Sequence, residues 1–298
     1  NSRLPMPATQ RVPEMAASSA SARPTGAIRP SNTHRAATPG LPRFEALTGL
    51  IYAGLALEGM AGHVDPAVAA LSVECEREVN AEGGISTRNP EELLDIFTLL
   101  VWVDQGMTTA SLKPDGALLR AIERIAPAIR TLRLGDGRLV EFHDGRMASG
   151  PRIDQILADG GARSTFTSNE AMGYSRLSNG GSVLIMDTGP APSQNQASWI
   201  CGCALGFEFS AASNVIFRSV GSGRDFGDAL RKAGQVTSAF SVGSIQRYNV
   251  GSAGKRRLIS AALARDTKVT LLGAERGPEI ASVLEAQHTG YQNRYGLT

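Results

Sequence analysis

The sequence has few cysteines, little net charge and no long apolar run. Its 298 residues include three cysteines, too few for a disulfide scaffold, and the odd number leaves at least one unpaired within the chain. No stretch approaches the roughly 18 uncharged apolar residues that a membrane-spanning helix requires. The 42% of hydrophobic residues is nevertheless typical of a globular protein with a sizeable core. We therefore expect a soluble protein that needs no oxidising compartment.

The charge is almost balanced, and the basic excess lies at one end. Thirty basic residues stand against 28 acidic ones, which gives a net charge of +2. Residues 1–42 carry five arginines and one glutamate, or +4, so the remaining chain carries −2. Because a nucleic-acid groove needs a concentrated basic surface, this distribution argues against nucleic-acid binding.

Residues 1–42 have the composition of a disordered arm. Seven of the 15 prolines lie there among Ala, Ser, Thr and Arg, with few large apolar side chains. Such a segment buries too little apolar surface to offset the entropy lost on ordering. A solvated tail and a basic docking arm are both compatible with this composition.

Apolar periodicity divides the rest of the chain into a helical part, residues 43–135, and a strand part, residues 136–298. Four helical segments joined by short turns come first. After the Gly-Asp-Gly at 135–137 the period becomes two, between Gly, Asn, Asp and Pro turns, with one short helix expected at "RIDQILADGG". The strand candidates are "RLVEFH", "GYSRLS", "GSVLIMDTG", "CALGFEFS", "NVIFRSV", "SAFSVGSI", "LISAALA" and "KVTLLG". We predict an α+β protein in which helices precede an antiparallel β-sandwich.

Two of the cysteines lie one residue apart in "CGCALGFEFS", residues 201–210. In a strand, alternation would place Cys201 and Cys203 on the face that carries Leu205, Phe207 and Phe209, which is the core face. Neighbouring same-face side chains of one strand lie too far apart for an easy disulfide. A zinc site would need more ligands at suitable spacing, and the four histidines are scattered. We interpret the pair as buried hydrophobic residues.

Several segments, in order, resemble the bacterial heparinase II/III-like proteins. They are "FEALTGLIYAGLALEG", "EGGISTRNPEELLDIFTLLVWV", "GYSRLSNGGSVLIMDTGPAP", "CGCALGFEFS" and "GSGRDFGDALRKAG". That family pairs an α/α-toroid with a β-sandwich and includes polysaccharide lyases that act on uronate-containing glycans. The resemblance implies that this chain is the middle of a family member, with a partial toroid that a protein partner could cover. It also implies an acidic polysaccharide or oligosaccharide as ligand, and a protein of the bacterial periplasm or cytoplasm.

Elimination across a uronate C4–C5 bond requires a group that neutralises the carboxylate, a base and an acid. In "GGISTRNPEE", which is similar to the family's toroid signature, Arg88 and Asn89 lead into a helix N-terminus, where anions are attracted. We take Arg88 and Asn89 as candidate substrate-binding residues, Asn89 also as catalytic, and His143 near the domain boundary as the proton-transfer candidate. The structural alternative makes Asn89 a helix cap, Arg88 a solvated loop charge and His143 a surface residue.

The strand part departs from the family pattern at three positions. Cys201 stands where the family has a histidine, Phe240 replaces a second histidine, and Arg218 stands where metal-bearing members have an acidic residue. These changes remove ligands or catalysts, so we predict a metal-free protein without a cofactor. Two hypotheses follow: a polysaccharide lyase of weak or absent activity, and a non-catalytic scaffold that binds a glycan or a protein.

Overall fold

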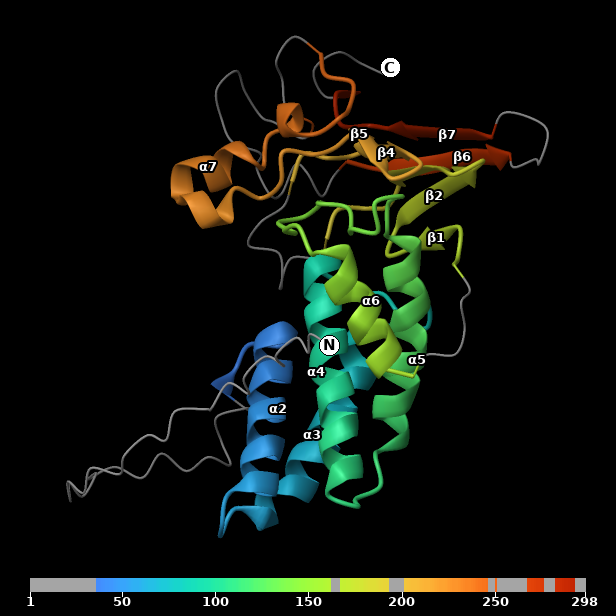
Figure 1. Ribbon diagram of the computed structural model, residues 1–298. Helices are drawn as coiled ribbons and strands as arrows, with labels where there is room; N and C mark the ends of the chain where they lie inside the picture. The colour runs from blue at the N-terminus through green and yellow to red at the C-terminus, as the bar shows by residue number, and fades with distance from the viewer. Residues whose placement is uncertain are drawn as a thin grey trace, which may run out of the picture.

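The computed structural model describes residues 36–161, 167–192, 201–245, 250, 267–275 and 282–292. The helices of residues 41–159 lie at one end of the molecule, and the strands lie at the other together with a short helix at 228–233 (Figure 1). This order confirms the predicted α+β architecture, with helices first and antiparallel strands after them. Residues 1–35, which are most of the predicted arm, lie outside the described ranges, and so does the candidate strand "LISAALA".

The helical part consists of α2 (Leu41–Ala56), α3 (Val64–Glu78), α4 (Pro90–Thr109) and α5 (Gly116–Thr131). Helix α2 packs against α3 and α4, and α5 packs against the same two helices. A 3-10 turn, η2 (Ala61–His63), leads into α3. In the described residues, α4 is the longest helix, and ten of its side chains are buried, so it forms the centre of the group. No helix of the described part is long and apolar enough to cross a membrane.

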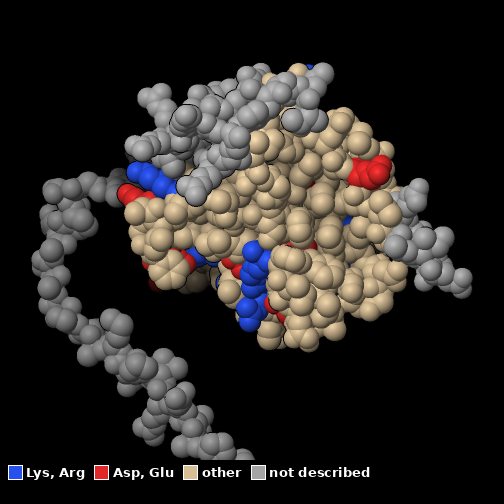
Figure 2. All heavy atoms as spheres, turned by 90° about the horizontal axis from the view of Figure 1, so that it is seen from above, with Lys and Arg blue, Asp and Glu red and all other residues tan. Residues whose placement is uncertain are grey.

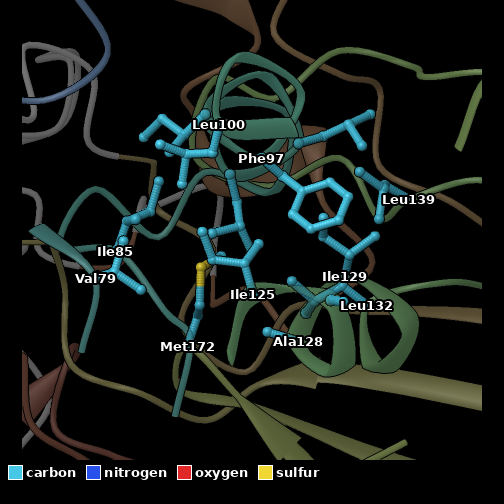
Figure 3. Packing of buried hydrophobic residues seen from close by; sticks show 14 of the residues in the cluster. Val79, Ile85, Phe97, Leu100, Ile125, Ala128, Ile129, Leu132, Leu139 and Met172 are labelled. Carbon is cyan, nitrogen blue, oxygen red and sulfur yellow. The ribbon is translucent and has the colours of Figure 1, made fainter. Parts of the chain in front are cut away.

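The core continues from the helices to the sheet. Phe97 and Leu100 of α4 face Ile125 and Ile129 of α5 (Figure 3). Met172, from the turn after β1, reaches into the same cluster and is 7% exposed. The short helix expected from the sequence is α6 (Gly150–Asp159), and it packs against α4 through its buried apolar face. The helices and the sheet therefore share one continuous hydrophobic core.

Five strands form an antiparallel sheet in chain order: β1 (Glu170–Ala171), β2 (Tyr174–Asn179), β3 (Ser182–Asp187), β4 (Phe207–Ala211) and β5 (Asn214–Phe217). A separate hairpin is formed by β6 (Val269–Glu275) and β7 (Val283–His288). Alternate residues of β3 are buried, so Asp187 lies on the same face as Val183 and Ile185. Its pairing partner is Tyr174, at the start of β2. This register places Tyr174 and Asp187 side by side at the ends of β2 and β3 that meet the helices.

Three strand predictions need correction. "RLVEFH" forms one isolated bridge, between Leu139 and Arg133, because this segment passes through the core between α5 and α6. "CALGFEFS" is a strand from Phe207 onward, whereas residues 201–206 form a loop with a bend at Gly202. "SAFSVGSI" contains η4 (Thr237–Ala239) and one bridge at Ser241. The preceding segment holds η3 (Arg224–Phe226) and the short helix α7 (Asp228–Ala233).

Gly83 fixes the approach of the α3–α4 loop to α5. Its φ is +77°, and an added Cβ would lie 1.9 Å from Arg124 O. Gly59 has a φ of +80°, but an added Cβ would meet nothing within 4 Å. We expect Gly83→Ala to lower the free energy of unfolding by about 2 kcal/mol more than Gly59→Ala, because only the first adds a backbone clash to the shared strain. Urea unfolding of both variants checks this, and equal losses would contradict it.

Candidate functional site

A buried polar cluster lies between the helical part and the sheet. Arg88 comes from the loop before α4, His143 from the loop after α5, and Cys203 from the loop before β4, while Tyr174 and Asp187 begin β2 and end β3. None of the five is more than 6% exposed. Buried polar groups are costly unless they are paired, so the bonds within this cluster decide what it can do.

Arg88 joins the two parts of the molecule through its guanidinium. Nε donates to Met172 O at 2.6 Å, Nη1 donates to Pro190 O at 2.6 Å, and Nη2 donates to Gly173 O at 3.0 Å. Nη2 also donates to Asp187 Oδ1 at 2.5 Å in an ion pair whose two side chains are 8% and 2% exposed. All three guanidinium nitrogens are therefore engaged by protein atoms, and Arg88 is not the solvated loop charge of the structural alternative.

Tyr174 completes the surroundings of Arg88. The Arg88 guanidinium carbon lies 4.7 Å from the centre of the Tyr174 ring, a cation–π distance. The Tyr174 hydroxyl donates to Arg88 O at 2.7 Å. Burial raises the pKa of Tyr174 well above its ordinary value, so the hydroxyl stays protonated at neutral pH. Tyr174 therefore holds the Arg88 backbone in place, where φ is +55°.

His143 pairs with the other oxygen of Asp187. The distance from His143 Nε2 to Asp187 Oδ2 is 3.2 Å, and Cys203 Sγ donates to the same oxygen at 3.2 Å. Cys203 Sγ also lies 3.7 Å from His143 Nε2. The carboxylate of Asp187 thus holds Arg88, His143 and Cys203 together.

The charges of the cluster follow from this pairing. Burial alone would raise the pKa of Asp187, but Arg88 and His143 together lower it to about 2. Burial lowers the pKa of His143, yet its hydrogen bonds with Asp187 and Cys201 outweigh this and raise it. An ionised Asp187 between Arg88 and His143 is a fixed ion network, a common use of buried charges in proteins.

Cys201 borders a small cavity beside this network. The cavity has a volume of about 20 Å³, room for about one water molecule, and its lining includes Cys201, His143, Arg88 and Asp187. Interactions with Cys203 and His143 lower the pKa of Cys201 to about 6 against the opposing effect of burial. Burial raises the pKa of Cys203 well above its ordinary value. Cys201 is therefore the more acidic thiol of the pair.

The structure brings two of the three predicted site residues together. Arg88 and His143 meet at Asp187, whereas the side chain of Asn89 caps α4 by accepting from Glu91 N at 2.9 Å and Glu92 N at 3.2 Å. His143 is 5% exposed, so it is not the surface residue of the structural alternative. Asp187 was missed, although it ends the alternating run "SVLIMD" on the face of Val183 and Ile185, which is a readable signal for a buried carboxylate.

An open groove adjoins the cluster on the side of β1. Its volume is about 490 Å³. It is lined by part of the α3–α4 loop, between residues 80 and 88, and by residues 170–173 and 190–192. Glu82 and Glu170 place exposed carboxylates in the groove, while Arg88, which also lines it, is buried. This groove is large enough for a saccharide or an extended peptide, but its charge is unfavourable for an acidic ligand.

The two other positions that depart from the family pattern are packed internally. Phe240 stacks on Phe142 with ring centres 6.0 Å apart. Arg218 lies 3.5 Å from a carboxylate oxygen of Glu141 and 3.9 Å from one of Glu208. Burial raises the pKa of Glu208 to about 7. These side chains now contribute to the core and to a second buried ion cluster.

A metal ion does not fit the polar cluster well. One ligand atom each of His143, Asp187 and Cys203 lies within 4.8 Å of the others. The carboxylate is already paired with Arg88, whose positive charge would repel a cation at this distance. Cys203 also donates its proton to Asp187, whereas a metal ligand must be a thiolate. The absence of metal stays a prediction that the bonding of Arg88 supports.

Comparison with known proteins agrees with this architecture. Residues 162–298 match the family model described as "Heparinase II/III-like, C-terminal". This match and the shared fold make the chain similar to the heparinase II/III-like proteins. A crystal structure of heparinase III superposes on 85% of the chain with a TM-score of 0.64 and 13% identity, and the chain covers 44% of that protein. The heparan sulfate lyase HepC from Pedobacter heparinus gives a TM-score of 0.56 with 15% identity, over 88% of this chain and 44% of that one.

A sequence relative has a different description. FtsZ-localized protein C of Caulobacter vibrioides (strain NA1000 / CB15N) is 32% identical over 173 residues, which are 57% of this chain and 30% of that protein. This heparinase II/III-like chain therefore spans less than half the length of the lyases and about a third of the FtsZ-localized relative.

We expect Arg88→Gln to lower the free energy of unfolding by about 3–5 kcal/mol, because it leaves the Asp187 carboxylate buried without its cation. Arg120→Gln is the matched control, since Arg120 pairs with Glu76 at 3.2 Å but the two side chains are 55% and 66% exposed. That change should cost less than about 1 kcal/mol. Chemical denaturation of both variants measures the difference. A loss at position 88 as small as at position 120 would contradict the buried clamp.

We expect the purified chain to hold much less than one zinc per molecule after dialysis, because Arg88 occupies the carboxylate that a cation would need. Elemental analysis of the wild-type chain and of the Cys201→Ser/Cys203→Ser double variant measures this. Stoichiometric zinc in the wild type that is lost in the double variant would show that the cluster is a metal site.

Proposed function

We propose that this chain is a non-catalytic family member whose toroid–sandwich frame binds a protein located with FtsZ. The observation that supports this best is the engagement of Arg88: its ion pair with Asp187 and its three carbonyl partners take four of its five N–H donors, so the guanidinium is committed to the protein. Without a group that neutralises the uronate carboxylate, the proton at C5 is not made acidic enough for a base to remove it.

The other two requirements of elimination are also poorly met. A general acid or base must reach the proton that it transfers within about 3 Å or through one water. His143 faces a cavity of about 20 Å³, far smaller than a sugar ring, and Tyr174 is fully buried. The amide oxygen of Asn89 accepts the two hydrogen bonds that cap α4. These four side chains support the frame and leave the adjacent groove without a catalyst.

Charge and exposed apolar surface favour a protein partner over an acidic glycan. The groove next to Arg88 carries the carboxylates of Glu82 and Glu170, which would repel a uronate polymer. On the face seen in Figure 2, blue and red side chains lie in small mixed groups and most of the described surface is tan, with no broad basic area for a polyanion. On the helices, Trp102 is 48% exposed and Tyr52 is 39% exposed.

Tyr52 of α2 lies against the backbone of Trp102 of α4. The Tyr52 hydroxyl donates to Trp102 O at 2.7 Å, so two exposed aromatic residues occur at one contact between the helices. Aromatic side chains of this kind are enriched at the centres of protein interfaces. The relationship to FtsZ-localized protein C suggests where such a partner is found. Polysaccharide elimination is the second candidate, and the fold shared with heparinase III favours it.

We expect no growth of ultraviolet absorbance when the chain is mixed with heparan sulfate or other uronate polymers, because no free group neutralises the carboxylate. Heparinase III run in parallel is the positive control. Growth that requires His143, tested with His143→Asn, would establish the lyase instead.

The binding half of the proposal is tested by localisation. A fluorescent fusion of the chain in Caulobacter cells should collect where FtsZ collects. Trp102→Ala should weaken this by about 30-fold, since truncating a hot-spot aromatic costs about 2 kcal/mol. Met147→Ala is the matched control, because Met147 is 55% exposed but lies outside the four toroid helices. An even distribution of the wild-type fusion through the cell would contradict the proposal.

A further inference from the structure

Cys201 and Cys203 lie close together beside His143, and neither is used in the proposed function. They are 8% and 1% exposed, and both are free thiols. The segment is a loop with a bend at Gly202, and Cys201 lines the same small cavity as His143, whose Nε2 lies 3.7 Å from Cys203 Sγ. Cys203 Sγ also lies 3.8 Å from Cys201 O. A regular strand would have kept the two side chains apart.

His143 gives this pair a proton donor and acceptor. Its ring lines the same cavity as Cys201, and its Nε2 lies 3.7 Å from Cys203 Sγ. Asp187 orients the ring through the 3.2 Å contact of its Oδ2 with His143 Nε2. A thiolate, a histidine and an orienting carboxylate form the arrangement that activates cysteine nucleophiles in proteins.

The cavity beside Cys201 restricts what can react there. With a volume of about 20 Å³ it can hold a molecule of the size of water or hydrogen peroxide. A sugar is far too large for it. In the folded chain the cavity therefore favours a small oxidant, and larger reagents such as thiols or dimedone reach Cys201 only when the loop opens.

Backbone strain is concentrated around the same groups. Non-glycine residues with positive φ include His143 at 48° and Asp144 at 70°, which are consecutive, and Leu205 at 59° in the cysteine loop. Arg88 and Met172, at 55° and 52°, lie on the opposite side of the cluster. Such conformations cost about 1–3 kcal/mol each and cluster where a site must be held in a fixed geometry.

We propose that Cys201 and Cys203 are a reversible redox pair that hydrogen peroxide oxidises to a disulfide within the loop. The Cys201 thiolate attacks one peroxide oxygen, an S–O bond forms, and the O–O bond breaks. The departing hydroxide takes the proton of His143 and leaves as water. Cys201 is now a sulfenic acid, and His143 is neutral.

The second step closes the disulfide. His143 takes the thiol proton of Cys203, and the Cys203 thiolate attacks the sulfur of Cys201. The S–S bond forms as the S–O bond breaks, and the departing hydroxide takes the proton back from His143 as water. Two thiol sulfurs have together lost two electrons to one peroxide, two waters are formed, and a dithiol reductant reverses the reaction.

Cys75 provides an internal contrast. It is 2% exposed on α3, and burial together with the neighbouring Glu74 raises its pKa to about 12. Its thiol is therefore protonated at neutral pH and should not react with peroxide at a comparable rate. One chain thus holds a reactive pair and an unreactive cysteine.

The experiment treats the fully reduced chain with one equivalent of hydrogen peroxide and counts thiols after denaturation. The count should fall from three to one, and peptide mapping should find Cys201 linked to Cys203 in the same chain. In Cys203→Ser, a sulfenic acid should accumulate at Cys201 and react with dimedone. Three remaining thiols, loss of Cys75, or a link between two chains would each overturn the proposal.

The role of His143 is tested by the pH profile of the rate at which hydrogen peroxide oxidises Cys201. The half-maximal rate should lie near pH 6 in the wild type, and in His143→Asn it should move toward about 8.5, the ordinary value for cysteine. Asparagine tolerates the positive φ at this position. Asp144→Asn is the matched control, because it changes the neighbouring strained residue at a side chain that pairs with Arg231 and not with the thiols. If His143→Asn does not fold, the dimedone reaction of Cys203→Ser still decides the proposal.

Discussion

The ion pair between Arg88 and Asp187 is the constraint on which the junction of the two parts depends. Arg88 precedes the helix at the centre of the helical part, and Asp187 ends the central region of the sheet. Because both side chains are almost fully buried, neither charge is tolerable alone. The loops that carry His143 and Cys203 are then held at the free oxygen of the same carboxylate. Removing one member therefore affects all the others.

The sequence predicted the class and order of the elements better than their limits. The helices and the paired strands around "GYSRLSNGGSVLIMD" follow directly from apolar periods of 3.6 and two. The apolar period of two wrongly predicted a strand at residues 201–205. Alternate residues there resemble those of a strand, but the backbone turns, and Leu205 has a φ of 59°. Alternation describes side chains that share an environment, and a buried loop can produce it without forming a ladder.

The candidate site was half predictable for a similar reason. Arg88 and His143 stand out by residue type beside helix and domain limits, and both belong to the cluster. What they do there depends on Asp187, which is 99 residues beyond Arg88 and becomes its partner only through the register of β2 and β3. A sequence pattern can identify a charged residue as a candidate, but the partner that neutralises it comes from the tertiary structure.

The positions that depart from the family pattern show how a catalytic frame can become a packed one. Phe240 adds a ring to the stack of Phe142 and Tyr174, whose centres are 5.3 Å apart, and Arg218 is placed among buried carboxylates. The Phe240 ring gains dispersion energy by being packed, and Arg218 supplies a counter-charge to carboxylates that would be costly to bury alone. Cys201 differs from both, because it has kept a histidine partner and a cavity. Of the three replaced positions, it alone combines burial with a group that can still exchange a proton, so chemistry at this junction is confined to what a thiol can do.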